Sequence, residues 1–347
     1  MKSIIKNIKG RLAITTLLLV CLLLVNGTGY TQVDSTISEE ITEAPTKPKP
    51  VKNTFESVWI IDNQSVMVPV KGTLEMDIMH RFGTINKGYS DFWGFFAPSN
   101  IRLGMSYAPV KNLFVGFGIT KSNMLWDLNA KYALLQQTKG VYPVSVTYYG
   151  NMAYDSRKFE NITLYDGTPI KHESDRLSFF HQLIVARKIS EKLSVQLAPS
   201  VSHQNAVKGY YTKNDSTGQE IFREMKNDHF ALAISARYKL TEVTSVLVNY
   251  DQPITKHPVN NPDPNLSFGV EFKTSSHAFQ LFFGNYFYLN PQRNNLFNRN
   301  SPFVYTDNTK THPNRYEDDP ATDGDESLKV RGGQFLIGFN ITRLWNY

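Results

Sequence analysis

The stretch IRLGMSYAPVKNLFVGFGIT, residues 101–120, decides the fold class because it holds two strand patterns joined by a very short link. In the first half, apolar residues at the odd positions from Ile101 to Tyr107 alternate with polar or small ones. A period of two is typical of a strand with two different faces. The pattern resumes over 112–120, and only residues 110–111 intervene. The stretch therefore predicts an antiparallel hairpin of two long strands.

The same alternation recurs along most of the chain, for example from Trp126 to Tyr132 and from Leu266 to Phe272. Counting such segments predicts about twelve strands, most of them long enough to cross a bilayer at a tilt. They lie near 70–82, 99–109, 112–120, 124–135, 142–153, 176–189, 192–203, 228–240, 244–251, 265–274, 277–289 and 332–345.

The strand expected over 176–189 is ambiguous because both of its faces are apolar. The two candidate outer faces are Phe179, Leu183 and Val185, or Phe180, Ile184 and Ala186. Alternation alone therefore leaves the orientation of this strand open.

The links between these strands alternate between short and long. With the N-terminus taken as periplasmic, the inner links are 110–111, 136–141, 190–191, 241–243 and 275–276. The outer links are 83–98, 121–123, 154–175, 204–227, 252–264 and 290–331. Every inner link is short, and every outer link but one is long. Short periplasmic turns, long extracellular loops and an even strand count predict an up-and-down β-barrel of the outer membrane.

The last strand supports this interpretation. Its odd positions carry an apolar face that ends in aromatic residues, which resembles the C-terminal signal read by the barrel assembly machinery. The residues of this signal are Phe339, Ile341, Trp345 and Tyr347. Arg343 departs from the face, but it lies so near the periplasmic end that its guanidinium can reach the interface. We therefore expect the assembly machinery, outer-membrane lipid and lipopolysaccharide as partners.

The N-terminus reads as a signal peptide over residues 1–31, with a basic start, an apolar run around Cys21 and a polar exit. This predicts export by the Sec pathway. A lipoprotein modified at Cys21 is the alternative, but Val20 stands where a small residue is wanted. Residues 32–54 are rich in Thr, Glu, Pro and Lys and predict a flexible periplasmic leader, which leaves 55–347 for the barrel.

Composition excludes several classes of function. Cys21 is the only cysteine, so the exported chain has no disulfide framework or thiolate metal site. The net charge of +6 includes the basic residues of the signal peptide, so the remainder is near balance and gives no case for nucleic acid. The mean hydropathy of −0.33 suits a barrel, but it also suits a soluble periplasmic β-sandwich, which stays as the structural alternative.

Several stretches resemble a known family. They are WIIDNQSVMVPVKGTLEMDIMHRFG at 59–83, NIRLGMSY at 100–107, VGFGIT at 115–120, KYALLQQ at 131–137 and PVSVTYYGNMAY at 143–154. They are similar to the DUF5777 family of Bacteroidetes β-barrel proteins. The resemblance implies a barrel in the outer membrane, and it supplies no substrate or active-site residue.

If the apolar faces point to lipid, charged side chains of the strands must face the lumen, because a charge in hydrocarbon is costly. These lumen candidates are Glu75, Asp77, Arg81, Arg102, Asp127, Lys131, Arg237, Glu271 and Lys273. Acids and bases nearly balance. This favours mutual pairing inside a narrow barrel over a strongly ion-selective path.

Two loop features are weaker candidates. The first outer loop carries the aromatic residues Phe92, Trp93, Phe95 and Phe96. We expect them at the barrel mouth as a girdle or as packing for the loop, with an apolar ligand as the alternative. The last outer loop carries Asp319, Asp323 and Asp325, a weak calcium candidate without the order of an EF-hand. A solvated acidic loop is the favoured interpretation, so no metal is expected.

Catalysis has little support. Ser202 and His203 are adjacent, and Ser178 and His181 are three apart, so each pair divides between opposite faces of a strand. No catalytic triad, zinc cluster or phosphate loop is evident, and no cofactor is expected. The sequence predicts a small-solute channel or a non-catalytic surface scaffold or binding protein. A lipid-modifying enzyme of the outer membrane is the alternative.

Overall fold

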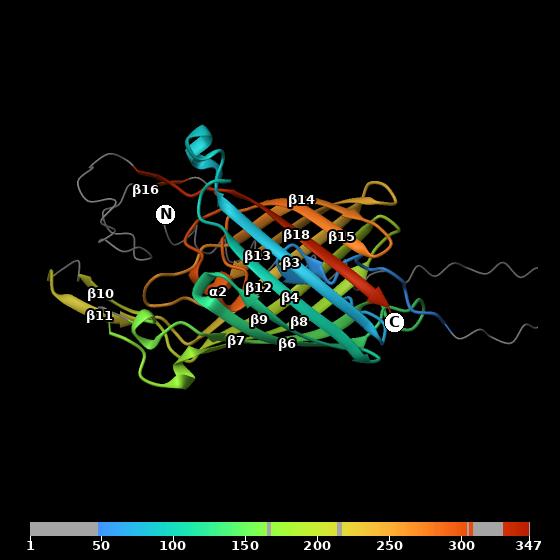
Figure 1. The fold of residues 1–347 in the computed structure, drawn as a ribbon, viewed down its shortest axis with the longest axis horizontal. Helices are drawn as coiled ribbons and strands as arrows, with labels where there is room; N and C mark the ends of the chain where they lie inside the picture. Colours follow the sequence, from blue (N-terminus) through green and yellow to red (C-terminus); the bar gives the residue numbers. More distant parts are fainter. Residues whose placement is uncertain (1–47, 165–167, 214–216, 304, 308–328, 347) are drawn as a thin grey trace, which may run out of the picture.

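The computed structural model describes residues 48–347 apart from 165–167, 214–216, 304, 308–328 and 347. Twelve antiparallel strands close into one barrel whose long axis is horizontal in Figure 1. They are β3 (Thr73–Thr84), β4 (Asn100–Val110), β5 (Leu113–Thr120), β6 (Leu125–Leu135), β7 (Ser145–Asp155), β8 (Leu177–Lys188), β9 (Leu193–Gln204), β12 (Asp228–Lys239), β13 (Thr244–Pro253), β14 (Asn265–Lys273), β15 (His277–Gly284) and β18 (Leu336–Asn346). The predicted twelve-stranded barrel is confirmed. Among the helices of the described residues, none has the length and apolar character needed to cross a membrane.

Each strand pairs with its neighbours, and the barrel closes where β18 pairs with β3. The strand bounds agree with the sequence expectation to within a few residues, except at the strand expected over 277–289. There β15 ends at Gly284, because the next backbone groups of the neighbouring strand segment are hydrogen-bonded by the side chain of Asn285. Its Oδ1 accepts from the Leu266 amide at 2.7 Å, and its Nδ2 donates to the Pro264 carbonyl at 2.8 Å. The chain then turns into the mouth of the barrel.

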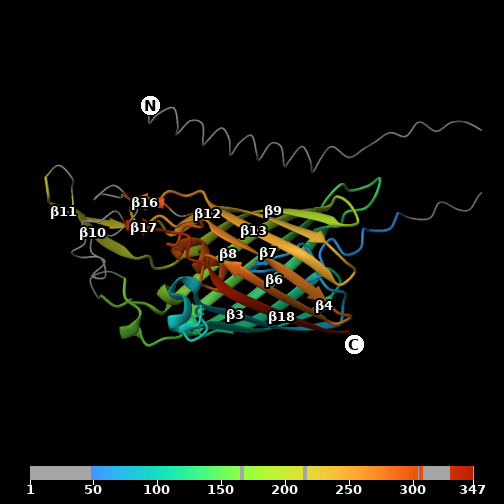
Figure 2. The same ribbon diagram turned by 90° about the horizontal axis from the view of Figure 1, so that it is seen from above.

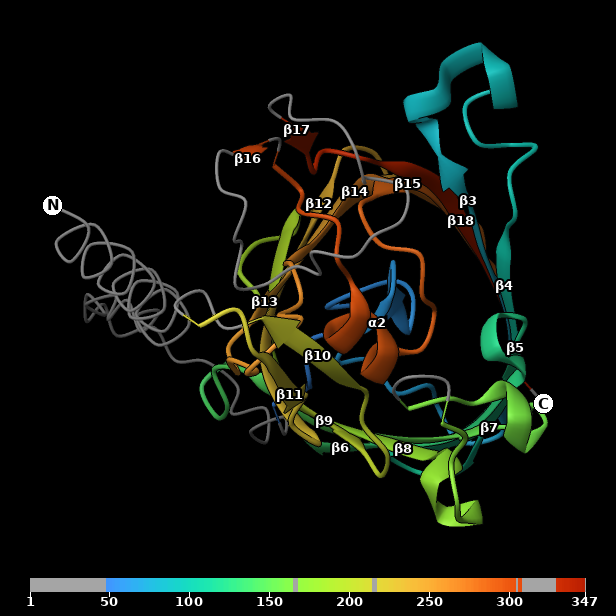
Figure 3. The ribbon, with the colours of Figure 1, turned by 90° about the vertical axis from the view of Figure 1, so that its left-hand side faces the viewer.

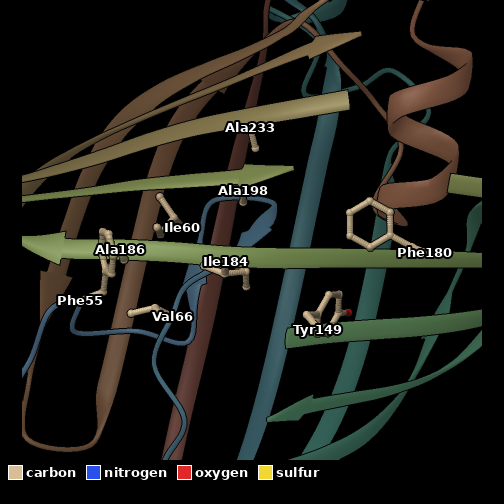
Figure 4. Close-up of a cluster of buried hydrophobic side chains, with 9 residues drawn as sticks. All are labelled: Phe55, Ile60, Val66, Tyr149, Phe180, Ile184, Ala186, Ala198 and Ala233. Atoms are coloured by element: carbon tan, nitrogen blue, oxygen red, sulfur yellow. The ribbon is translucent and has the colours of Figure 1, made fainter. Parts of the chain in front are cut away.

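The ambiguous strand β8 has a definite orientation. Phe180, Ile184 and Ala186 face the lumen and are buried, whereas Leu183 faces outward and is 42% exposed. The inward apolar face has a partner, because a chain segment lies inside the barrel. Figure 4 shows Ile184 beside residues of that segment.

The segment inside the lumen is the stretch 54–68, called the plug below (Figures 3 and 4). Its centre is a small hairpin of β1 (Trp59–Ile60) and β2 (Asn63–Gln64). Phe55, Ile60 and Val66 of the plug pack against inward side chains of β7, β8, β9 and β12. The sequence assigned residues from 55 onward to the barrel as a whole. In the structure the wall begins only at Thr73, and the plug fills the interior.

Both ends of the plug lie at the inner end of the barrel. Before it, the Val51 amide donates to the Gln137 carbonyl at 2.7 Å in the inner link 136–141. After it, the Gly72 amide donates to the Ala108 carbonyl at 2.8 Å, near the inner end of β4. Residues 48–53, expected as part of a leader, thus lie against the inner turns.

The long loops all lie at the opposite, outer end (Figure 2). The outer links, including the short one between β5 and β6, carry the short helices η1 (Ile85–Asp91), η2 (Ser122–Met124), η3 (Phe159–Asn161), η4 (Glu173–Arg176) and α2 (Pro291–Phe297). They also carry the hairpins β10 (Gly209–Lys213) with β11 (Glu220–Glu224) and β16 (Tyr305–Asp307) with β17 (Lys329–Arg331). Figure 3, which looks at this end, shows α2 within the ring of strands.

Candidate functional site

The structure places the charged side chains selected from the sequence on the lumen side of the wall. Buried there are Glu75, Asp77, Arg81, Arg102, Asp127, Lys131, Arg237 and Glu271. Lys273 lies near the inner end, and its side chain is partly exposed. The lumen is therefore a polar interior that must satisfy many buried charges.

Arg102 forms the tightest charge cluster of the lumen wall. Its Nη1 lies 2.7 Å from Asp77 Oδ2, and its Nε and Nη2 lie 3.0 and 2.9 Å from the carboxylate of Asp127. The Asn151 amide also donates to Asp127 at 3.0 Å. A planar guanidinium suits two carboxylates at once, so these charges are engaged with one another rather than with a solute path.

A second charge cluster includes a plug residue, Glu56. Its carboxylate lies 2.8 Å from Lys273 Nζ and 3.6 Å from Arg237 Nη2. Arg237 Nε also pairs with Glu271 at 3.0 Å. Sequence reasoning did not select Glu56, because nothing in a polar stretch ahead of the first strand shows that it folds back into the barrel.

Amide side chains of the wall satisfy the backbone of the plug. Gln280 accepts from the Ile61 amide at 3.1 Å and donates to the Trp59 carbonyl at 2.9 Å. Gln196 likewise accepts from the Val66 amide at 3.0 Å and donates to the Gln64 carbonyl at 2.8 Å. Buried backbone groups require such partners. A glutamine can act as donor and acceptor together, so these two side chains bond the plug backbone in the way that a neighbouring strand would.

The tip of the plug, Ile61 and Asp62, connects it to the outer end. Asp62 Oδ1 accepts from Tyr286 at 2.5 Å and from Asn249 at 3.0 Å, and Asp62 Oδ2 accepts from Asn294 of α2 at 3.0 Å. Ile61 has a φ of 60°, which is strained for a β-branched residue. It is held there by burial against Leu247 and Phe282 of the wall.

The helix α2 covers the plug from the outer side and is held by polar contacts. Gln292 donates to Asn151 at 2.9 Å, and Asn295 accepts from Asn265 at 3.2 Å. The helix buries Gln292, Asn294, Asn295 and Leu296. The plug and α2 meet at Asp62, so together they occupy the lumen toward both ends, with a cavity of about 380 Å³ left at the inner end beside Glu56 and Lys273.

A small cavity of about 110 Å³ lies among the outer loops beside α2, and we call it the outer pocket. The basic residues on its lining are Arg157, Arg176, Lys208 and Arg293, and the carboxylates are Asp155 and Asp175. The sequence pattern did not select these residues, since they belong to three loops that are distant in sequence.

The aromatic residues Phe92, Trp93, Phe95 and Phe96 lie just after η1 in a loop that projects sideways from the wall (Figures 1 and 3). Their rings pack on one another: the ring centroid of Phe92 lies 5.4 Å from that of Trp93 and 5.8 Å from that of Phe95. Phe95 in turn lies 4.4 Å from Phe82 on the outer face of the wall. The cluster was expected at the mouth. The structure places it beside the barrel, continuous with the lipid-facing surface.

The Ser and His pairs are divided between faces. Ser202 and Ser178 are buried toward the lumen. On the outer face, His203 Nδ1 lies 2.7 Å from Asp228, and His181 Nδ1 lies 2.6 Å from the Tyr148 hydroxyl. Neither histidine therefore reaches the serine near it in sequence.

Some candidates lie outside the described residues. These are the signal peptide, the acidic residues Asp319, Asp323 and Asp325, and the terminal Tyr347. The described part of the C-terminal signal, Phe339, Ile341 and Trp345, follows the outward register of β18.

Residues 55–345 match the family model described as a membrane-bound β-barrel domain, DUF5777. The chain belongs to this family. The match begins with the plug and includes every wall strand almost to the C-terminus, so the plug is part of the family domain. No curated protein matches the chain.

Solved structures similar to this DUF5777 chain include outer-membrane proteins. The NanC porin is 8% identical, with 79% of this chain and 99% of that chain covered and a TM-score of 0.41. An outer-membrane channel from Pseudomonas putida F1 is 12% identical, with 80% and 97% covered and a TM-score of 0.41. OmpT, an outer-membrane protein of Vibrio cholerae, is 14% identical, with 79% and 78% covered and a TM-score of 0.31.

Proposed function

We propose that this outer-membrane barrel is a closed, non-catalytic binding protein of the cell surface rather than an open channel. The observation that carries the proposal is the plug. Residues 54–68 occupy the lumen, and their side chains and backbone are bonded to the wall on several sides. Binding would then take place on the outer loops, which form the largest part of the chain outside the wall.

The contacts of the plug make its removal costly. Each buried hydrogen bond contributes about 0.5–1.5 kcal/mol, and each large apolar side chain such as Phe55 or Ile60 contributes about 1.5–3 kcal/mol. Removal would also take Glu56 away from Arg237 and Lys273. A buried charge that loses its partner is strongly destabilising. The plug is therefore part of the folded core.

A gated channel is the second candidate function, and one observation favours it. The plug is held by wall side chains such as Gln196 and Gln280, whereas the backbone pairing that closes the barrel joins wall strands only to one another. The plug can therefore leave without breaking the barrel ladder. In that case the closed form is a resting state, and a ligand or partner would draw the plug out.

Planar-bilayer recordings with a cross-linked plug distinguish the two. Asn63 Nδ2 lies 2.8 Å from Asp251 Oδ1, so Asn63→Cys with Asp251→Cys, bridged by a short thiol-specific cross-linker, ties the plug to the wall in a chain that starts at residue 32 and lacks Cys21. The control pair is Tyr148→Cys with Leu183→Cys, which stand directly opposite each other on two wall strands and face outward. Heat-modifiable gel migration shows that each protein is folded.

We expect the folded wild-type protein to be silent in the bilayer. Conductance that disappears only when the 63–251 pair is cross-linked would support the gated channel. Steady conductance that persists with the plug tied would contradict closure by the plug.

A further inference from the structure

The outer pocket has more positive than negative charge, and only some of its cations form ion pairs. Arg157 is paired with Asp155, through contacts of 2.9 and 2.7 Å. Arg176 pairs with Glu173 at 2.8 Å and donates to the Asp155 carbonyl at 2.8 Å. These two guanidinium groups hold the loop between β7 and β8 in place, and their charges are matched.

Lys208 and Arg293 have no such ion-pair partner among the described residues. Among the described residues, neither makes an ion pair, and the Nε of Arg293 is buried without an acceptor. Arg293 stacks on the ring of Phe297 at 5.0 Å, and its Nη2 lies 3.2 Å from the side-chain amide of Asn123. An aromatic face and a neutral amide do not neutralise a guanidinium.

The electrostatics agree with a deficit of negative charge. Burial lowers the pKa of Lys208, and the positive charges of Arg293, Arg157 and Arg299 lower it further. Burial also lowers the pKa of Arg293, and the nearby Tyr288 and Asp155 offset only part of this effect. An anion in the pocket would offset the repulsion between these groups.

We infer that the outer pocket binds a phosphate group between Lys208 and Arg293, an inference that rests on the proposed binding function of the outer loops. A phosphate monoester carries a charge of about −1.5 to −2 at neutral pH, which matches two unpaired cations. Its oxygens accept the forked donors of a guanidinium and the point charge of an ammonium. A cavity of about 110 Å³ admits a group of this size.

The phosphate group has two possible sources, free inorganic phosphate and the phosphate groups of lipopolysaccharide around the barrel. Both present the same tetrahedral oxyanion. The test therefore measures calorimetric binding of inorganic phosphate, of lipopolysaccharide and of enzymatically dephosphorylated lipopolysaccharide to the full detergent-solubilised barrel, at one fixed ionic strength.

The variants are Lys208→Gln and Arg293→Gln. Lys208 lies on an outer loop and only part of its side chain is buried in the pocket, so we expect its variant to fold as the wild type does. Arg293 is part of α2, and gel migration checks the folding of its variant. Lys192→Gln is the matched control, because it removes one exposed positive charge from the turn at the opposite end of the barrel.

We expect saturable binding that each pocket variant weakens about tenfold or more, as for one lost charge-assisted hydrogen bond, and that Lys192→Gln leaves unchanged. Saturable binding of inorganic phosphate identifies a free anion. Binding of lipopolysaccharide alone, lost on dephosphorylation, identifies the lipid-borne group. If Lys208→Gln and Arg293→Gln bind all three probes as the wild type does, or if no probe binds, the inference is overturned.

Bilayer recordings of the same samples separate this test from that of the proposed function. A conducting barrel that still binds phosphate through Lys208 would contradict only the closed state. A silent barrel that binds no probe would contradict only the phosphate site.

Discussion

The inner and outer halves of the lumen are both occupied, but by segments with different contacts. In the inner half, Phe55, Ile60 and Val66 of the plug pack on an apolar patch of the wall. In the outer half, Leu296 of α2 also packs on apolar side chains, and hydrogen bonds from amide side chains such as Gln292 and Asn295 are added to that packing. We therefore expect packing to contribute most of the stability of the inner half, and polar groups to contribute more in the outer half.

The largest effect should come from the apolar patch behind the plug. Ile184→Ala removes a fully buried side chain between β8 and the plug, and we expect a loss of about 2–5 kcal/mol in unfolding free energy. Urea unfolding in detergent, followed by tryptophan fluorescence, measures it. Leu183→Ala on the lipid-facing side of the same strand is the control. An equal loss in both variants would contradict a core formed around the plug.

A smaller effect should appear at the junction of plug and α2. Asp62→Asn and Asn294→Ala each weaken the contact of 3.0 Å between them, and a double-mutant cycle should give a coupling of about 0.5–3 kcal/mol. Asp62→Asn combined with Gln292→Ala is the control, since Gln292 is on the same helix but bonds to Asn151. Additive effects in both cycles would show that the plug and α2 contribute to stability independently.

The smallest effect should be a pH dependence confined to the outer half. Burial, with the charges of Lys226 and Arg299, lowers the pKa of His257 to about 4. His257 Nδ1 accepts from the Lys226 amide at 3.0 Å, and its Nε2 faces His229 at 2.9 Å, which suits a neutral ring. The stability that neutral His257 contributes is complete above its unfolded pKa of about 6.5 and is lost as the pH falls toward 4.

We therefore expect the urea midpoint of the wild-type protein to fall more steeply between pH 6.5 and pH 4 than that of His257→Gln. Glutamine keeps a polar side chain at this position without the titration. Parallel pH profiles would show that protonation of His257 does not cause the loss of stability. The Ile184→Ala loss should be the same at both pH values, because its cause is packing.

The sequence predicts the wall well because every wall strand has its own local pattern. Lipid on one side and a polar lumen on the other impose a period of two, and short inner turns fix the order of the strands. The interior follows a different rule. Phe180 and Ile184 face inward because the plug lies against them, and alternation along β8 cannot reveal a partner more than a hundred residues away.

The two apolar faces of β8 are nevertheless the one sign of the plug in the sequence, although the pattern alone only leaves the orientation of this strand open. A strand with two apolar faces in a membrane barrel requires an apolar partner in the lumen, and Phe55, Ile60 and Val66 provide it. Asp62 shows the opposite case. It looks like an ordinary polar turn residue, and its role depends on Asn249, Tyr286 and Asn294, which only the folded barrel brings together.

The residues that flank the plug, Val51 before it and Gly72 after it, both bond to the inner end of the barrel. The plug is thus a loop inserted from one side, and the circle of wall strands is complete without it. Replacing residues 54–68 by a short flexible linker would spare the backbone pairing of the wall, but it would leave Lys131 without Gln64 and Arg237 and Lys273 without Glu56. In that sense the chain carries its own counterion for the cations of its lumen.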